Sequence, residues 1–93
     1  MGKLNGRVAI VTGSTGGIGK AVAELFAAEG AKVLTNGRRA AEAESVAQAI
    51  RDGGGEAISV RGDVSKPEDV ENIAAAAVSE WGTVDILVNN AAI

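Results

Sequence analysis

The amino-acid sequence predicts an α/β protein, half of a doubly wound parallel sheet with the element order βαβαβαβ and the strand order 3-2-1-4. Three observations support this prediction. Short aliphatic runs, typical of strands buried on both faces, alternate with longer stretches in which apolar residues recur with a period near 3.6. The connections are short, which favours parallel strands joined by crossover helices. A glycine-rich loop lies between the first strand and the first helix.

Four aliphatic runs are expected to form the strands of one small domain of 93 residues. Turn residues or helical patterns bound each run, and no linker, repeat or low-complexity segment separates them. The predicted strands are Arg7–Val11, Lys32–Asn36, Ala57–Arg61 and Asp85–Asn89.

Two helices are expected between the first three strands. The first covers Gly17–Glu29 and stops at Gly30, which suits a left-handed cap. Its apolar face is predicted to contain Ile18, Val22, Leu25 and Phe26. The second covers about Ala40–Asp52 and stops at three consecutive glycines. Its apolar face is predicted to contain Ala43, Val46, Ala47 and Ile50.

The third helix, which ends near Trp81, has the clearest signals. Ser65 and Glu68 have the spacing of a capping box, and Pro67 falls in the first turn. The apolar residues predict one continuous packing stripe along the helix. These residues are Val70, Ile73, Ala74, Ala77, Val78 and Trp81.

Composition excludes several classes of function. A net charge of −3 argues against a nucleic-acid partner, because phosphate backbones are bound by basic surfaces. No apolar run approaches the length of a bilayer span, and no signal segment opens the chain, so no membrane partner is expected. The absence of cysteine excludes disulfides and thiolate metal sites and fits a cytoplasmic protein. Without histidine or tyrosine, histidine-based acid/base catalysis and a phenol donor are also absent from this chain.

The glycine-rich loop could bind phosphate in two ways. A P-loop would end at Gly19-Lys20, but its first glycine would fall on Ser14 and its magnesium-binding hydroxyl on Ala21. A dinucleotide-binding loop needs glycines for a tight turn, for a close approach to pyrophosphate and for close packing of helix on strand. An ordinary glycine-rich turn without a ligand is the third reading. The position between a strand and a helix favours the dinucleotide, because helix N-terminal N–H groups attract phosphate.

Four segments together resemble the short-chain dehydrogenase/reductase family. They are TGSTGGIG at Thr12–Gly19, NGRR at Asn36–Arg39, DV at Asp63-Val64 and NNAAI at Asn89–Ile93. Each segment lies at the carboxyl end of its own predicted strand, where open α/β sheets bind ligands. The resemblance covers the chain and implies that residues 1–93 form a dinucleotide-binding (Rossmann) segment.

The resemblance implies cofactor roles for individual residues. The glycines that would admit the pyrophosphate are Gly13, Gly17 and Gly19. The donors would be Ser14, Thr15 and the N–H of Ile18. Thr12 would be structural, with its hydroxyl tying the loop to the strand that carries Asn89.

Further implied contacts surround the adenosine. Asp63 would accept a hydrogen bond from the adenine amino group, with the N–H of Val64 beside it; the alternative is a carboxylate that only caps a turn. The adenosine ribose would be lined by Asn90, Ala91 and Ala92. The family usually has glycine where this chain has Ala92.

The residues after the second strand predict NADP(H) as cofactor. An acid there would accept hydrogen bonds from the ribose hydroxyls of NAD, whereas a guanidinium binds a 2′-phosphate. Gly37 occupies the usual acidic place, and Arg38 and Arg39 follow it. The alternative is that both arginines only begin a solvated helix.

Family members transfer hydride between a nicotinamide and a carbonyl or secondary alcohol, using a Tyr-x-x-x-Lys pair and a serine. These residues would lie beyond Ile93, so we expect no catalytic residue here and an inactive segment by itself. The alternative function is a non-enzymatic nucleotide-binding or interaction module. An open edge on the fourth strand, with its Ile86-Leu87-Val88 core, predicts weak stability or self-association.

Overall fold

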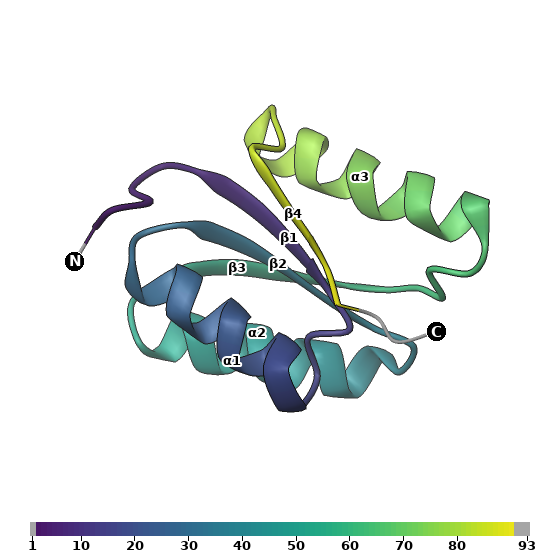
Figure 1. Cartoon of the computed structure of the whole chain (residues 1–93), viewed down its shortest axis with the longest axis horizontal. Helices are drawn as coiled ribbons and strands as arrows, with labels where there is room; N and C mark the ends of the chain where they lie inside the picture. The colour runs from purple at the N-terminus through teal and green to yellow at the C-terminus, as the bar shows by residue number, and fades with distance from the viewer. Residues whose placement is uncertain (1, 91–93) are drawn as a thin grey trace.

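The computed structural model describes residues 2–90, which form a parallel sheet flanked by helices (Figure 1). Every boundary that the sequence predicts lies within one residue of the observed one. The strands are β1 (Val8–Thr12), β2 (Lys32–Gly37), β3 (Glu56–Arg61) and β4 (Ile86–Asn89). The helices are α1 (Gly17–Ala28), α2 (Ala40–Asp52) and α3 (Pro67–Trp81). Within the described part of the chain, none of them combines the length and apolarity needed to cross a membrane.

The sheet has the predicted order β3-β2-β1-β4, and each neighbouring pair is parallel. The chain first winds outward from β1 to β3 and then returns to the other side of β1. Because crossover connections between parallel strands are right-handed, this reversal places α1 and α2 on one face of the sheet and α3 on the other (Figure 1). The carboxyl ends of β1 and β4 therefore flank a topological switch point.

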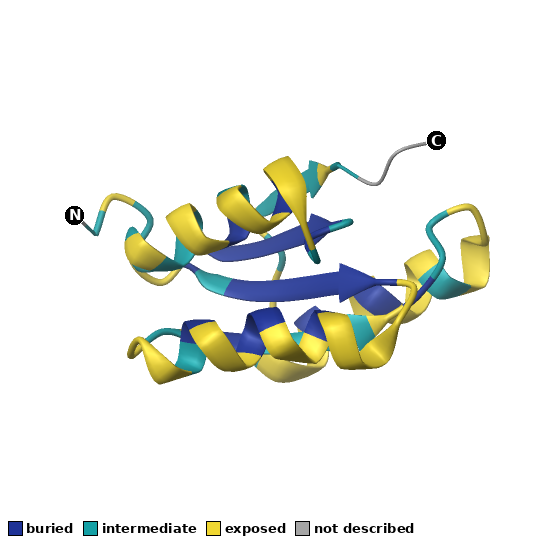
Figure 2. Ribbon diagram, turned by 90° about the horizontal axis from the view of Figure 1, so that it is seen from below, coloured by how far each residue is buried: buried dark blue, intermediate teal, exposed yellow. Residues whose placement is uncertain are grey.

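Two apolar layers cover the two faces of the sheet. Residues of β1 and β2 are buried almost throughout, as Figure 2 shows for the strands between the yellow outer faces of the helices. The layer under α1 and α2 is formed by Val11, Ala23, Ala31, Val33, Val46, Ala47, Ile50 and Ala57. The layer under α3 is formed by Val8, Ile10, Leu34, Ile73 and Ala77. All four residues predicted for the apolar face of α2 are buried, which confirms that prediction.

The predicted apolar face of α1 is wrong in part. Ile18 and Leu25 are 74% and 58% exposed, whereas Gly19 and Ala23 are buried against the sheet. Small residues let the helix axis come close to β1. Val22 and Phe26 of the predicted face are partly buried and pack against the core, so the prediction is right for these two residues. The left-handed end of the helix is confirmed, because Gly30 has φ of 96°.

The start of α3 differs from the predicted capping box. The N-cap residue is Lys66, and it makes no side-chain cap. Ser65 Oγ instead donates to Asp63 Oδ1 at 2.7 Å, because this carboxylate lies two residues away in the same turn. The stripe is also narrower than predicted: Ile73 and Ala77 are buried, whereas Ala74, Val70 and Val78 are exposed..

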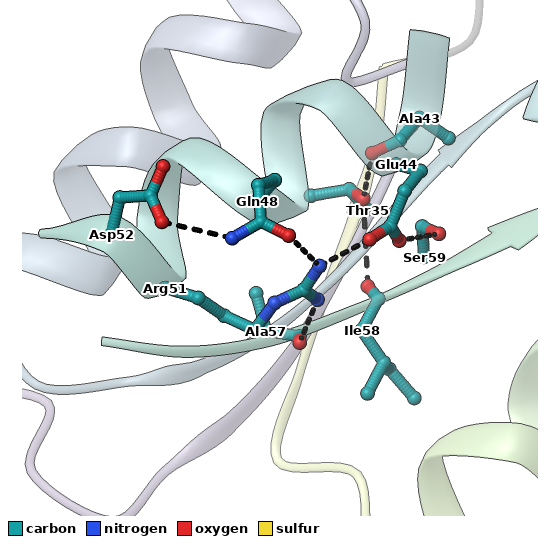
Figure 3. Close-up of polar contacts among 9 residues, drawn as sticks. All are labelled: Thr35, Ala43, Glu44, Gln48, Arg51, Asp52, Ala57, Ile58 and Ser59. Atoms are coloured by element: carbon teal, nitrogen blue, oxygen red, sulfur yellow. Dashed lines mark hydrogen bonds and ion pairs between the residues drawn. The ribbon is translucent and has the colours of Figure 1, made fainter. Parts of the chain in front are cut away.

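Polar side chains fasten α2 to β3 at the edge of the sheet (Figure 3). Arg51 Nη1 donates to Ala57 O at 2.8 Å, and Arg51 Nη2 is ion-paired with Glu44. Glu44 also accepts a hydrogen bond of 2.6 Å from Ser59 Oγ. The bonds from Ser59 and then Arg51 lower the pKa of the Glu44 carboxyl. These bonds therefore fasten α2 to β3, the strand at this edge of the sheet.

Candidate functional site

A cleft of about 850 Å³ lies along the carboxyl ends of the strands. It is bounded by the loop after β1, the turn after β2 and the loop after β3, together with residues of α3 and β4. The lining residues are Thr12, Gly13, Thr15, Asn36, Gly37, Arg38, Arg39, Glu42, Gly62, Asp63, Val64, Ser65, Val70, Leu87 and Asn89. The segments singled out in the sequence therefore meet at one edge of the sheet, as predicted.

Three glycines shape the main chain of the loop that opens α1. Gly13 and Gly17 have φ of 61° and 57°, a region that L side chains rarely adopt. A Cβ on Gly19 would lie 2.2 Å from Gly13 O, so a bare main chain is required where α1 meets β1. Gly16 is the N-cap of α1 and supplies no side-chain acceptor. The first N–H groups of α1 are consequently available to a ligand.

Ser14 and Asn36, which sequence reasoning treated separately, form one buried unit. Ser14 is fully buried, and its Oγ accepts from Asn36 N at 2.8 Å and donates to Asn36 O at 3.3 Å. This placement argues against the predicted donation from the Ser14 hydroxyl to a phosphate. Asn36 was not predicted as a site residue; the available signal was an amide side chain at the end of an aliphatic run.

Thr12 ties the loop to β4 as the sequence predicts. Its Oγ1 donates to Val88 O at 3.3 Å and accepts from Asn90 N at 3.1 Å. Asn90 Nδ2 in turn donates to Gly13 O at 3.3 Å. These bonds couple the ends of β1 and β4 across the switch point. The predicted contacts of Ala91 and Ala92 lie outside the described residues.

Asp63 lines the cleft and also caps a turn with one of its carboxylate oxygens. The turn-capping alternative is therefore correct for that oxygen. Asp63 Oδ1 accepts from Ser65 N at 3.0 Å and from Ser65 Oγ at 2.7 Å. These two bonds, the hydroxyl first, lower the pKa of the Asp63 carboxyl below its ordinary 3.8, and the charges of Arg38 and Lys66 act in the same direction. The carboxylate thus stays ionised as a hydrogen-bond acceptor at neutral pH. Val64 beside it is half-buried and packs on the core under α3.

Replacing Ser65 with alanine should raise the pKa of Asp63 toward 3.8, because both the hydroxyl bond and the local turn are weakened. A carboxyl whose pKa is lower in the folded than in the unfolded state stabilises the folded protein at pH values above the unfolded-state pKa. This stabilisation is lost as the pH falls through the folded-state pKa. The variant should therefore lose less stability than the wild type on acidification below pH 4. NMR titration of the Asp63 carboxyl measures the shift; an unchanged pKa would contradict it.

The turn after β2 presents one guanidinium to the cleft without a carboxylate partner among residues 2–90. Arg39 Nη1 is 3.5 Å from Glu42 Oε2, whereas Arg38 makes no such pair in this part of the chain. Arg61 Nε donates to Arg38 O at 3.1 Å, which holds the main chain of the turn against β3. A Cβ on Gly37 would lie 2.4 Å from Thr15 Cγ2, so the Thr15 methyl occupies the space of a side chain there.

A parallel sheet with helices on both faces and a cleft at its switch point defines the class of open α/β proteins that bind ligands at the carboxyl edge. A family model described as short chain dehydrogenase matches residues 7–93. The chain therefore belongs to the short-chain dehydrogenase family. This membership implies a nicotinamide cofactor, NAD or NADP, and does not favour a non-enzymatic module.

Three relatives illustrate the similarity. An uncharacterised oxidoreductase of Methylorubrum extorquens is 44% identical over 94 residues, which are 100% of this chain and 38% of that protein. A hydroxysteroid dehydrogenase from Escherichia coli aligns with a TM-score of 0.94 and 41% identity over 97% of this chain and 38% of that one. A short chain dehydrogenase from Mycobacterium avium aligns with a TM-score of 0.93 and 41% identity over 97% of this chain and 34% of that one. The chain thus spans little more than a third of these relatives and matches their amino-terminal part.

Proposed function

We propose that this chain is the NADP(H)-binding portion of an oxidoreductase that transfers hydride between a nicotinamide cofactor and a carbonyl or secondary alcohol. The family supports the reaction class, and the hydroxysteroid dehydrogenase among the solved relatives supports a substrate of the alcohol type. When bound, the nicotinamide would carry the hydride. The chain's own residues would bind and orient the remainder of the dinucleotide. The lack of cysteine supports a cytoplasmic location.

The residues of the cleft fit a dinucleotide. The requirement for a bare main chain at Gly19, combined with an N-cap that offers no side-chain acceptor, supports a pyrophosphate at the start of α1. Asp63 would accept from the adenine amino group with its Oδ2, because Oδ1 is already bonded to Ser65. Thr15 and the N–H of Ile18 would donate to the phosphates. Asn90, tied to Gly13, would border the ribose.

The single observation that carries the preference for NADP(H) is the guanidinium of Arg38 at the cleft. Among the described residues it forms no ion pair, and its charge acts on Asp63 without such a contact, so it could bind a 2′-phosphate without breaking an ion pair. The place where an acid would accept the NAD ribose hydroxyls is Gly37.

Titration of the chain with NADPH and NADH tests this preference. We expect NADPH to bind at least about tenfold more tightly, which corresponds to about 1.4 kcal/mol. The difference should shrink with added salt, because it depends on an exposed charge. Fluorescence of the reduced nicotinamide measures both affinities. Equal affinities for the two cofactors would contradict the assignment of NADP(H), and no binding of either would contradict the function.

We also propose that copies of the chain associate through β4. Within residues 2–90 β4 pairs only with β1, and Leu87 in its centre is 65% exposed. Unprotected edges of this kind pair with other strands, whereas a charge discourages pairing. Sedimentation velocity should detect species larger than a monomer in the wild type and fewer in Leu87→Lys. A wild type that stays monomeric at all concentrations would contradict this proposal.

A further inference from the structure

Asn36 is a buried amide whose polar atoms bond to two different loops of the cleft. Its side chain lies at the carboxyl end of β2, and the residue is 1% exposed. Asn36 Oδ1 accepts from Gly13 N at 3.2 Å. Asn36 Nδ2 donates to Val60 O at 3.0 Å and to Gly62 O at 3.3 Å. A buried amide is costly without such partners, so the side chain is held in one orientation.

The main chain of Asn36 adds a second set of bonds to the loop after β1. Ser14 N donates to Asn36 O at 2.8 Å, and Asn36 N donates to Ser14 Oγ at 2.8 Å. The regular pairing of β1 with β2 ends one residue earlier, at Val11 opposite Thr35. Asn36 therefore extends the connection between the strands into the glycine-rich loop, where the β ladder has stopped.

These bonds set the separation between the loop after β1 and the loop after β3. Gly13 lies at the start of the loop that leads to the free N–H groups of α1, and Gly62 precedes Asp63 on the opposite wall of the cleft. The amide of Asn36 lies between them and bonds to both. A ligand that contacts only one wall does not require this separation, whereas a dinucleotide that reaches from α1 to Asp63 does.

We propose that Asn36 is a positioning residue for dinucleotide binding, which holds the loop after β1 and the loop after β3 at the separation that one ligand spans. This inference rests on the proposed function. Asn36 borders the cleft but is only 1% exposed, so it acts through Gly13, Ser14 and Gly62. Its loss should consequently weaken the binding of ligands that touch both loops more than the binding of ligands that touch one loop.

The test compares NADPH with 2′-AMP, which lacks the pyrophosphate and so engages the adenosine side alone. In Asn36→Leu we expect the Kd of NADPH to rise on the order of tenfold or more and that of 2′-AMP to change by less than about threefold. Asn36→Ser retains a small polar group and is easier to accommodate. It should likewise raise the Kd of NADPH more than the Kd of 2′-AMP. Affinities are measured well below the melting midpoint of each variant, so that the unfolded fraction is negligible.

Thr35→Val is the matched control for a role in stability alone. Thr35 is equally buried, and its Oγ1 donates to Ala43 O at 2.8 Å in α2 rather than to either loop of the cleft. This variant should melt at a lower temperature and bind NADPH within about twofold of the wild type. Hydrogen exchange of the Gly13 amide gives an independent reading, because its protection should fall in Asn36→Leu and persist in Thr35→Val.

The outcomes separate the inference from the function on which it rests. A wild type that binds neither NADPH nor 2′-AMP overturns both. A wild type that binds both ligands, with Asn36 variants whose affinities are unchanged or fall equally for the two, overturns the inference alone. An unaltered exchange rate at Gly13 in Asn36→Leu and Asn36→Ser would also overturn it.

Discussion

Gly19→Ala is expected to destabilise the chain by about 2 kcal/mol or more and to remove its nucleotide affinity. The new Cβ would lie 2.2 Å from Gly13 O and 2.6 Å from Asn90 Nδ2. The first of these atoms is main chain and cannot turn aside, so α1 would have to move away from β1. In a chain of this size a loss of 1 kcal/mol lowers the melting midpoint by about 4–8 °C. Circular dichroism measures the midpoint, and NADPH titration measures the affinity.

Gly16→Ala is the matched control for this substitution. Gly16 is in the same loop, has an extended backbone with φ of −166°, and has nothing within 4 Å of an added Cβ. Its replacement should cost less than about 1 kcal/mol, the usual scale for changes at an N-cap. A Gly19→Ala variant that melts and binds NADPH like Gly16→Ala would show that close packing at the start of α1 is not required.

Arg38→Ala is expected to raise the Kd of NADPH by about tenfold or more while the Kd of NADH stays within about twofold. A hydrogen bond to a charged group contributes about 1.5–3 kcal/mol, and only NADPH has the 2′-phosphate that would receive it. The preference between the two cofactors should therefore be abolished. Titrations of both reduced cofactors, carried out at one fixed salt concentration, measure the change.

Arg39→Ala provides the comparison at the next position. The Arg39 guanidinium is 3.5 Å from Glu42, so this cation is already partly neutralised. We expect its removal to change the NADPH affinity by less than about threefold. If Arg39→Ala had the larger effect, the phosphate contact would belong to Arg39 instead. If neither variant altered the preference, the basic pair would be part of a solvated helix start.

The order of elements could be predicted because local and global signals agree. In α2, Ala43, Val46, Ala47 and Ile50 repeat at helical spacing and are all buried. In α1 the same reasoning held only for Val22 and Phe26, which are partly buried and pack against the core. The buried residues of the helix are Gly19 and Ala23, whereas Ile18 and Leu25 are exposed. A glycine in a helix can mark the closest approach to a strand, which hydrophobic spacing does not reveal.

The candidate site was predicted in position, but its internal bonding was predicted only in part, as for the bonds of Thr12 to β4. Glycines, acids and arginines at strand ends could be assigned from the sequence because the carboxyl edge of a parallel sheet brings them together. The hydrogen bonds of Asn36 with Gly13 and Gly62 depend on distances between strands far apart in the sequence. The bonding of Ser65 could not be predicted either: its hydroxyl donates to Asp63 and does not cap α3.

The central requirement is that the main chain at the start of α1 binds the diphosphate of a dinucleotide. Amide correlation spectra of the ¹⁵N-labelled chain, recorded during addition of NADPH, test it at single residues. The resonances of Gly17, Ile18 and Gly19 should shift in step with binding, while that of Gln48 on the exposed side of α2 stays in place. NADPH binding that left the three amides of α1 unmoved would contradict this requirement.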